Sequence, residues 1–306
     1  AYLLIILLLI AVLLFGKNLQ GGQRWLKIGP LQFQPSELAK FIIVICMAKY
    51  MTDHHEDMPS FVRGLLPMAA LLVVPAVLIY FQPNVSMLII LCIVFAIMLF
   101  IGGADLKYLS IAALIGGAAL VVLLFAASYR ESRFTAWLDP WGNKSDAGYQ
   151  IVQSLYAFGN GGWFGQGLDA SRQKLLFLPY RESDFILSII AEELGFVTVA
   201  LLIAAYCFII YRGIRIALSV RDRFASLVAA GFSSILAVQV AVNVAVVTNS
   251  IPATGQTLPF ISSGGTSLVI FLAGIGVLLN ISRYTEPRKS RGESYGKHKN
   301  QKQRQQ

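Results

Sequence analysis

Asp184 occupies the position in this sequence that is best suited to chemistry. It stands between a polar stretch rich in glycine and aromatic residues, residues 128–183, and a hydrophobic run that begins DFILSII. A carboxylate where a helix enters lipid costs several kcal/mol, about 3 at the bilayer centre, so such a residue usually has a partner or a task. Asp184 is therefore either a helix-start carboxylate that accepts hydrogen bonds from free backbone N–H groups or a residue with a chemical task.

Glu192 is a second carboxylate on the same hydrophobic run. On an ideal helix it lies about 80° around the axis from Asp184 and roughly 12 Å deeper. We therefore expect Glu192 to face the same interior cavity as Asp184, with Glu193 pointing elsewhere.

A charged pair occurs where GQRWLKIGPLQFQPSELAK leads into a helix whose start is marked by Pro35 and Ser36. Glu37 and Lys40 are i, i+3 neighbours on one face of that helix. The two charges either neutralise each other near the membrane interface or, beside Arg24, line a polar cavity.

Two further stretches interrupt the hydrophobic pattern. Gln82-Pro83-Asn84 is short enough to be explained as a turn. In residues 243–267, prolines and glycines break what would otherwise be two membrane helices, and broken backbone at membrane depth is tolerated only where protein or a watery cavity satisfies it. This stretch predicts a cavity wall, although transporters contain interrupted helices as well.

The elements that hold these residues follow from composition. With 56% hydrophobic residues, 13% charged residues and a mean hydropathy of +0.66, the chain is an integral membrane protein. Cys46, Cys92 and Cys207 lie in apolar runs, which argues against a disulfide framework and a clustered zinc site. Eight runs are long enough to cross about 30 Å of hydrocarbon. They are residues 2–15, 36–51, 62–80, 86–102, 108–127, 184–211, 225–248 and 264–282.

The basic residues of the connections predict the orientation, because cytoplasmic loops carry an excess of Lys and Arg. Lys107, the loop with Arg212 and Arg223, and the C-terminal tail are expected on the cytoplasmic side. The tail, residues 287–306, is basic and has no apolar period, which predicts disorder. It is either a solvated tail or a site for acidic lipid or a protein partner. Most of the net charge of +9 lies on this side, so no nucleic-acid partner is implied.

The stretch of residues 128–183 then forms one large extracytoplasmic loop. Its basic residues do not contradict this orientation, because long loops are translocated across the membrane largely regardless of their charge. Its mixture of aromatic residues and glycines indicates ordered structure, with a short helix over residues 149–158 along the interface. The glycines of residues 159–167 either bring backbone close to a ligand or form tight turns. Six basic residues are available to an anionic ligand: Arg130, Arg133, Lys144, Arg172, Lys174 and Arg181.

Four long motifs follow one another along the chain up to Arg283: QRWLKIGPLQFQPSELAK, LDPWGNKSDAGYQIVQSLYAFGNGGWFGQGL, LPYRESDFILSIIAEELG and IPATGQTLPFISSGGTSL. In order and spacing they closely resemble the SEDS family (FtsW, RodA, SpoVE) of bacterial shape, elongation, division and sporulation proteins. The wording YRESRFTAWLDPW and VVTNSIPATGQTLPF looks more like the FtsW division branch than the RodA branch.

The resemblance implies an all-α, polytopic bundle of ten helices with both termini in the cytoplasm. The eight segments would be the third to the tenth helix, and residues 1–286 would form the transmembrane domain. The resemblance thus implies that the first two helices are missing, and the chain opens on Ala1 rather than Met, as expected where the start of a longer protein is missing. Family members are peptidoglycan glycosyltransferases of the bacterial cytoplasmic membrane. They polymerise lipid II and work with a class B penicillin-binding protein and other division or elongation proteins.

The essential loop aspartate of the family falls on Asp184, and the polar residues of its QPSELAK motif fall on Glu37 and Lys40. Many relatives have His-Thr where this chain has Glu182-Ser183. They also have Asp-Leu-Gly where it has Asn84-Val85-Ser86, and Ser-Tyr-Gly-Gly where it has Ser262-Ser263-Gly264-Gly265. These departures leave Asp184 in place, but they exclude Asn84 from the catalytic set.

The resemblance implies an inverting displacement in which Asp184 acts as general base on the acceptor hydroxyl. The leaving diphosphate needs positive charge, which Arg24, Lys40, Arg181 or a divalent cation (Mg²⁺ or Mn²⁺) could supply. No cofactor is certain. The candidate substrate-binding residues are Arg24, Glu37, Lys40, Arg181, Glu192, Ser262, Gly264 and Gly265.

Two other functions remain open. A lipid II flippase would suit the interrupted helices of residues 243–267, but a carrier needs access from both faces, and the unusual polar residues gather on the outer side. A scaffold without catalytic activity would only position penicillin-binding and division partners.

Overall fold

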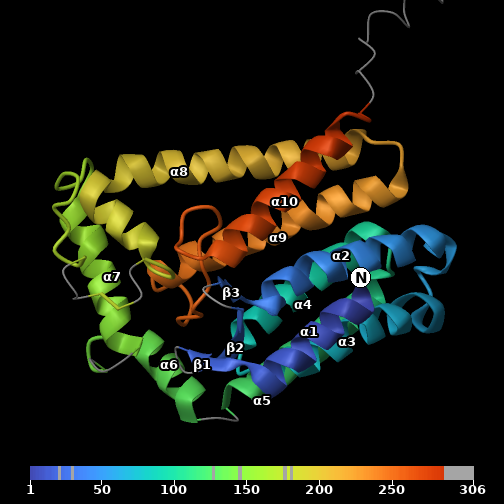
Figure 1. The fold of residues 1–306 in the computed structure, drawn as a ribbon, viewed down its shortest axis with the longest axis horizontal. Coiled ribbons are helices and arrows are strands. Elements are labelled where there is room, and N and C mark those ends of the chain that lie inside the picture. Colours follow the sequence, from blue (N-terminus) through green and yellow to red (C-terminus); the bar gives the residue numbers. More distant parts are fainter. Residues whose placement is uncertain are drawn as a thin grey trace, which may run out of the picture.

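The computed structural model describes residues 1–285, apart from residues 20–21, 29–30, 126–127, 144–146, 175–177 and 180–181. The predicted tail (residues 287–306) and Arg181 lie outside the described residues. The described chain is mainly α-helical, as predicted (Figure 1). Its helices are α1 (Tyr2–Phe15), α2 (Pro35–Asp53), α3 (Leu66–Phe81), α4 (Val85–Gly102), α5 (Leu106–Phe125), α6 (Ser128–Leu138), α7 (Ala147–Gly161), α8 (Ile186–Ser219), α9 (Arg223–Val247) and α10 (Gly265–Ser282).

Each of the eight predicted membrane segments coincides with one of these helices, namely α1 to α5 and α8 to α10. Within the described residues, five spans are long and apolar enough to cross a membrane: Phe61–Phe81, which joins a π-helical turn (Phe61–Leu65) to α3, and α4, α8, α9 and α10. Helix α1 and the described part of α5 are apolar but shorter. Helix α2 is continuous, but charged residues, among them Glu37 and Lys40, interrupt its apolar sequence.

Helix α9 lies at the centre of the bundle, where it packs against α2, α4 and α8. Small residues allow this close approach. A side chain at Gly231 would overlap Val44 of α2 and approach Met98 of α4, and a side chain at Gly213 of α8 would overlap Ser233 of α9. Close backbone packing through small residues is typical of helices in membranes.

Several helices begin together at one end of the bundle, which we call the cavity end. Pro35 opens α2 with a fixed φ and no unsatisfied N–H. The side chain of Asn84 caps α4 by accepting from the Met87 N–H at 3.4 Å. Helix α10 also begins there, at Gly265, after the interrupted segment of residues 248–264 that follows α9. The turns between helices therefore gather polar side chains at this end.

A small antiparallel sheet at the cavity end was not predicted. It has the order β1 (Lys17–Leu19), β2 (Gly22–Ile28), β3 (Leu31–Phe33), with Lys17 opposite Trp25 and Leu26 opposite Phe33. It connects α1 to α2. The strands are short, and only β3 alternates apolar and polar residues strictly, so they do not stand out beside the long hydrophobic runs.

The predicted extracytoplasmic loop contains α6 and α7, which lie beside the cavity end in Figure 1. Helix α7 confirms the helix predicted for residues 149–158. The chain after α7 inserts into a break in α8 at Gly195, where φ is 78°. There the N–H groups of Gln166 and Gly167 donate to the carbonyls of Glu192 and Glu193 at 3.0 Å. After the break, the N–H groups of Phe196 and Val197 donate to the carbonyls of Gly162 and Trp163 at 2.9 and 3.1 Å. The loop and both parts of α8 thus form one hydrogen-bonded unit.

Candidate functional site

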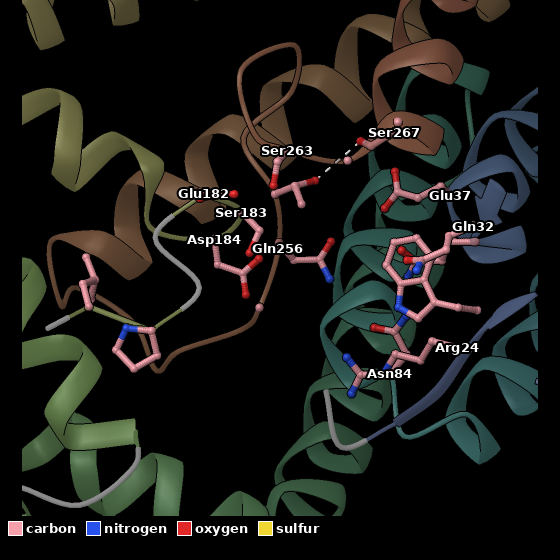
Figure 2. Close-up of a pocket in the computed structure, with 18 residues that line it drawn as sticks. Arg24, Gln32, Glu37, Asn84, Glu182, Ser183, Asp184, Gln256, Ser263 and Ser267 are labelled. Atoms are coloured by element: carbon pink, nitrogen blue, oxygen red, sulfur yellow. Dashed lines mark hydrogen bonds between the residues drawn. The ribbon is translucent and has the colours of Figure 1, made fainter. Parts of the chain in front are cut away.

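A cavity of about 740 Å³ opens at the cavity end, between the sheet, α2, the turn before α4, the segment that enters α8 and the interrupted segment after α9. Figure 2 shows Glu182, Ser183 and Asp184 on one side of this cavity and Arg24, Gln32, Glu37 and Asn84 on the other. Its lining residues are Arg24, Trp25, Gln32, Gln34, Glu37, Asn84, Leu178, Pro179, Glu182, Ser183, Asp184, Gly255, Gln256, Thr257, Ser263, Gly264, Gly265 and Ser267. The lining is rich in amides, hydroxyls and charges, so it suits a polar ligand.

Asp184 does not cap α8, because Phe185 holds the cap position and no side chain caps this helix. Burial raises the pKa of its carboxyl to about 6, against the opposing effects of Arg133, a hydrogen bond from Ser183, and Arg24. The side chain nevertheless borders the cavity and is partly exposed. Asp184 is therefore a carboxyl group that changes its charge close to neutral pH and does so where a ligand can reach it.

Gly255 forms the wall next to this carboxylate. Its φ is +68°, and a side chain there would bring its Cβ to 3.3 Å from Asp184 Oδ2. Both the backbone conformation and the close approach favour glycine. The prediction that residues 243–267 form a cavity wall agrees with this arrangement.

The backbone carbonyls of Asp184 and of the two residues before it are bound by donors from residues 243–267. Ser263 N donates to the Glu182 carbonyl at 2.7 Å, and Ser262 Oγ donates to the Ser183 carbonyl. Asn243 Nδ2 donates to the Asp184 carbonyl at 2.9 Å. Ser262, predicted to bind substrate, does not line the cavity; its hydroxyl also accepts from Leu258 N at 2.7 Å and is thus used within the protein. Gly264 and Gly265 do line the cavity.

Glu37 and Lys40 form an ion pair of 3.0 Å, but only Glu37 lines the cavity. The side chain of Lys40 is 1% exposed and points beneath the cavity, where it donates to Gln239 Oε1 of α9 and lies 5.3 Å from the ring centre of Phe271. The prediction that Lys40 faces the ligand is wrong, because Lys40 lies about one helical turn after Glu37 and therefore deeper in the bundle. Gln239 in turn donates to the Thr257 carbonyl at 3.1 Å, so Lys40 supports the wall through Gln239.

Arg24 lies in β2 and faces the cavity as predicted. Its guanidinium donates to the carbonyls of Gln82, at 3.4 Å, and Pro83. Asn84, interpreted as a turn residue, has two functions: it caps α4, and it lines the cavity.

Glu192 does not face the cavity, which corrects the prediction from helical geometry. Its carboxylate accepts from Asn160 at 3.2 Å, from the Ser171 hydroxyl and from Gln173 N at 3.2 Å. The end of α7 and the turn at residues 171–173 cover that side of α8 and supply these donors. The sequence cannot show this, because the donors come from a loop without a periodic pattern.

Helix α6 supplies a residue that the sequence only grouped with other basic residues. Arg133 Nη1 donates to the Ala253 carbonyl at 2.8 Å, and Trp137 Nε1 donates to the Asn249 carbonyl at 3.0 Å. The helix is thus bound to the interrupted segment just before Gly255. Its distance along the sequence from residues 249–253 explains why no local pattern could reveal this contact.

Residues 1–287 match the cell cycle protein family of FtsW, RodA and SpoVE. The chain belongs to this family. The stage V sporulation protein E of Bacillus subtilis (strain 168) is 40% identical over 280 residues, which are 91% of this chain and 76% of that protein. A probable peptidoglycan glycosyltransferase FtsW of Geobacter sp. (strain M18) is 38% identical over 277 residues, 90% of this chain and 76% of that protein. Since these identities are nearly equal, assignment of this FtsW/RodA/SpoVE member to the division branch stays a prediction.

Solved structures support the same family. A chain of a peptidoglycan synthase complex, described for its coordination of polymerization and crosslinking, has a TM-score of 0.77 and 30% identity over 92% of this chain and 79% of that one. The rod shape determining protein RodA of Thermus thermophilus has a TM-score of 0.67 and 29% identity over 94% of this chain and 77% of that one. The FtsW/RodA/SpoVE fold and the apolar spans identify a multi-pass membrane protein.

Proposed function

We propose that this FtsW/RodA/SpoVE family member is a peptidoglycan glycosyltransferase that polymerises lipid II into β-1,4 glycan strands. The observation that carries the proposal is the Asp184 carboxyl, held at the wall of a polar cavity with its pKa raised to about 6. The names of the Geobacter relative and of the synthase complex support it. The growing strands serve cell division or cell-wall growth.

Asp184 acts as the general base of one inverting displacement. It accepts the proton of the acceptor 4-hydroxyl as that oxygen forms a bond to C1 of the donor sugar, while the bond from C1 to the diphosphate oxygen breaks. The donor of the proposed reaction is α-linked and its product β-linked, so a single displacement gives the required inversion at C1. With a pKa of about 6, the group is mostly ionised at neutral pH and still basic enough to take a proton.

Arg24 is the described cation best placed to receive the departing diphosphate, because it lines the cavity on the side opposite Asp184. Guanidinium groups bind phosphate oxygens through charge-assisted hydrogen bonds. Lys40 is assigned instead to the support of Glu37 and Gln239. Arg181 stays a candidate from the sequence.

A divalent cation would supply further positive charge if one were bound. Among the described residues, no group of three or more His, Cys, Asp or Glu side chains comes together in the way a dedicated metal site requires. Mg²⁺ or Mn²⁺ stays a candidate from the sequence for this role.

An apolar groove of about 450 Å³ between α3, α4 and α5 suits the prenyl chain of such a substrate. Its lining runs along α4 from Leu88 to Leu99, and α4 begins next to Asn84, which lines the polar cavity. A polar cavity and an apolar groove along one helix match a substrate with a charged head and a long hydrocarbon chain.

The cavity end faces the outside of the cytoplasmic membrane in this proposal. The end of the bundle away from the cavity carries basic residues, as the positive-inside rule requires of the cytoplasmic side. They include Lys107 at the start of α5 and Arg212 and Arg215 near the end of α8. The C-terminus is then cytoplasmic. A class B penicillin-binding protein and other division or elongation proteins are the proposed partners.

The interrupted segment of residues 248–264 needs no transport function. It forms the wall against Asp184 and is bound to the backbone of Glu182 and Ser183, so its irregular backbone is explained by the site. Purified protein given labelled lipid II distinguishes the functions. Glycan strands that disappear with Asp184→Asn support the transferase, lipid movement without polymer supports a flippase, and neither activity supports a scaffold.

A further inference from the structure

Three consecutive backbone carbonyls, those of Glu182, Ser183 and Asp184, are each bound by a donor from another part of the chain. The donors are Ser263 N, Ser262 Oγ and Asn243 Nδ2. Backbone carbonyls at the entrance of a helix would otherwise be free to bind water. We call this set of three hydrogen bonds the carbonyl clamp.

Asn243 differs from the other two donors because its amide joins two walls of the cavity. It comes from α9, is 1% exposed, and donates both to the Asp184 carbonyl at 2.9 Å and to the Gln256 carbonyl at 2.8 Å. Both residues line the cavity, whereas Asn243 does not. The Asn243 Oδ1 atom has no donor among the described residues, so the N–H groups are what this buried side chain contributes.

We propose that Asn243 is a positioning residue that sets the place of the Asp184 carboxylate relative to the adjacent wall at Gly255 and Gln256. The inference rests on the proposed transferase function. Asn243 does not line the cavity, and it acts through the backbone of Asp184 and Gln256.

The consequence for chemistry follows from the small tolerance at this wall. The Asp184 carboxylate already lies against Gly255, next to Gln256. A shift of the backbone at Asp184 or at Gln256 therefore changes the direction in which the carboxylate points. A general base must reach the proton that it abstracts, and misplacement by about 1 Å can cost roughly 10²-fold in rate. The loss is expected in turnover, because the surfaces that hold the lipid substrate remain in place.

The test compares Asn243→Ala, Asn243→Asp and Ser262→Ala in the full protein, with lipid II polymerisation as the readout. Asn243→Ala removes two donors and is expected to lower kcat about 10- to 100-fold while KM changes less than about threefold. Asn243→Asp keeps the shape but turns an acceptor toward two carbonyls, so its kcat is expected to fall at least as far. Ser262→Ala removes one of the three hydrogen bonds of the carbonyl clamp and should lower kcat by a smaller factor. This variant tests the clamp if the Asn243 variants fold poorly.

Ser154→Ala is the matched control. Ser154 is fully buried near the same end of α9 and binds Ser188 Oγ and the Val247 carbonyl, both at 2.7 Å, but it has no bond to residues 182–184. Its kcat per folded molecule should stay within about twofold of the wild type, since it stabilises packing alone.

A second readout does not depend on turnover: the pH dependence with which a hydrophobic carbodiimide modifies Asp184, followed by mass spectrometry. Asn243→Ala is expected to change that profile and Ser154→Ala to leave it unchanged. The inference is overturned if Asn243→Ala keeps both wild-type turnover per folded molecule and the wild-type modification profile. If the wild type forms no glycan while Asn243→Ala still changes the profile, the proposed function fails and the positioning role stands.

Discussion

Asp184 and Glu192 belong to the same stretch of chain, yet their surroundings differ in kind. Glu192 is buried and takes hydrogen bonds from Asn160, Ser171 and Gln173, so its charge is satisfied within the protein. Asp184 borders the cavity next to Gly255, and burial raises its pKa to about 6. The comparison teaches that the donors around a carboxylate, rather than its depth, decide whether it supports the fold or remains available for chemistry.

The largest expected effect is that of Asp184→Asn on polymerisation. Without the base, the rate should fall by about 10²- to 10⁴-fold. Thermal stability should not decrease, because burial disfavours the charged form of this side chain and the amide is neutral. Glycan formation from labelled lipid II and a thermal melt check the two parts. An Asp184→Asn protein with wild-type turnover contradicts the catalytic assignment.

The charged pair of α2 offers the same contrast, since Glu37 lines the cavity and Lys40 lies beneath it. Lys40→Met should lower the free energy of unfolding by about 3–5 kcal/mol, because it leaves the buried Glu37 charge without its partner. Adding Glu37→Gln to this variant should restore part of the loss. Denaturation of the single and double variants measures the coupling, and additive losses would show that the pair is not coupled.

Glu192→Gln is expected to act on stability, not on chemistry. Exchange of one carboxylate oxygen for an NH₂ group turns a donor toward donors, which should cost about 1–3 kcal/mol. Turnover per folded molecule should stay near that of the wild type. A loss of kcat at full stability would place Glu192 with Asp184 after all and break the comparison.

The smallest expected effect is a shift in the pH dependence of kcat/KM, which reports on the ionisation of Asp184. Since Asp184 acts as a base when ionised, kcat/KM should decrease as the pH falls through about 6. Arg133 opposes the rise in the pKa of Asp184, so Arg133→Gln should move the lower limb of the profile to higher pH, and Arg133→Lys should leave it close to the wild type. An unchanged limb in Arg133→Gln would show that this charge does not act on the ionisation that limits the rate.

The sequence predicted the helices well, because long apolar runs are the strongest signal that a chain carries. It also placed Asp184, Glu37 and Arg24 at one end of the bundle, since all three stand where polar stretches meet such runs. The strands β1 to β3 were missed because each is too short to give a periodic signal that can be told from the surrounding sequence.

The remaining errors concern contacts between distant segments. Glu192 and Lys40 stand at helical positions that allow either a cavity or a packed interface, and the choice depends on Ser171 and on Gln239, which come from elsewhere in the chain. Arg133 meets Ala253 across a long separation in sequence. Periodicity fixes the face of a helix but not what packs on that face.

The break at Gly195 affects how α8 adapts to bilayers of different thickness. A membrane helix adapts to hydrocarbon thickness by tilting. The carbonyls of Glu192 and Glu193 accept from residues 166–167, and the N–H groups of Phe196 and Val197 donate to residues 162–163. We therefore expect α8 and the inserted loop to tilt as one unit, so that the end that carries Asp184 keeps its alignment with the wall beside it. We expect membranes of unequal thickness to present the same reaction geometry to the lipid substrate.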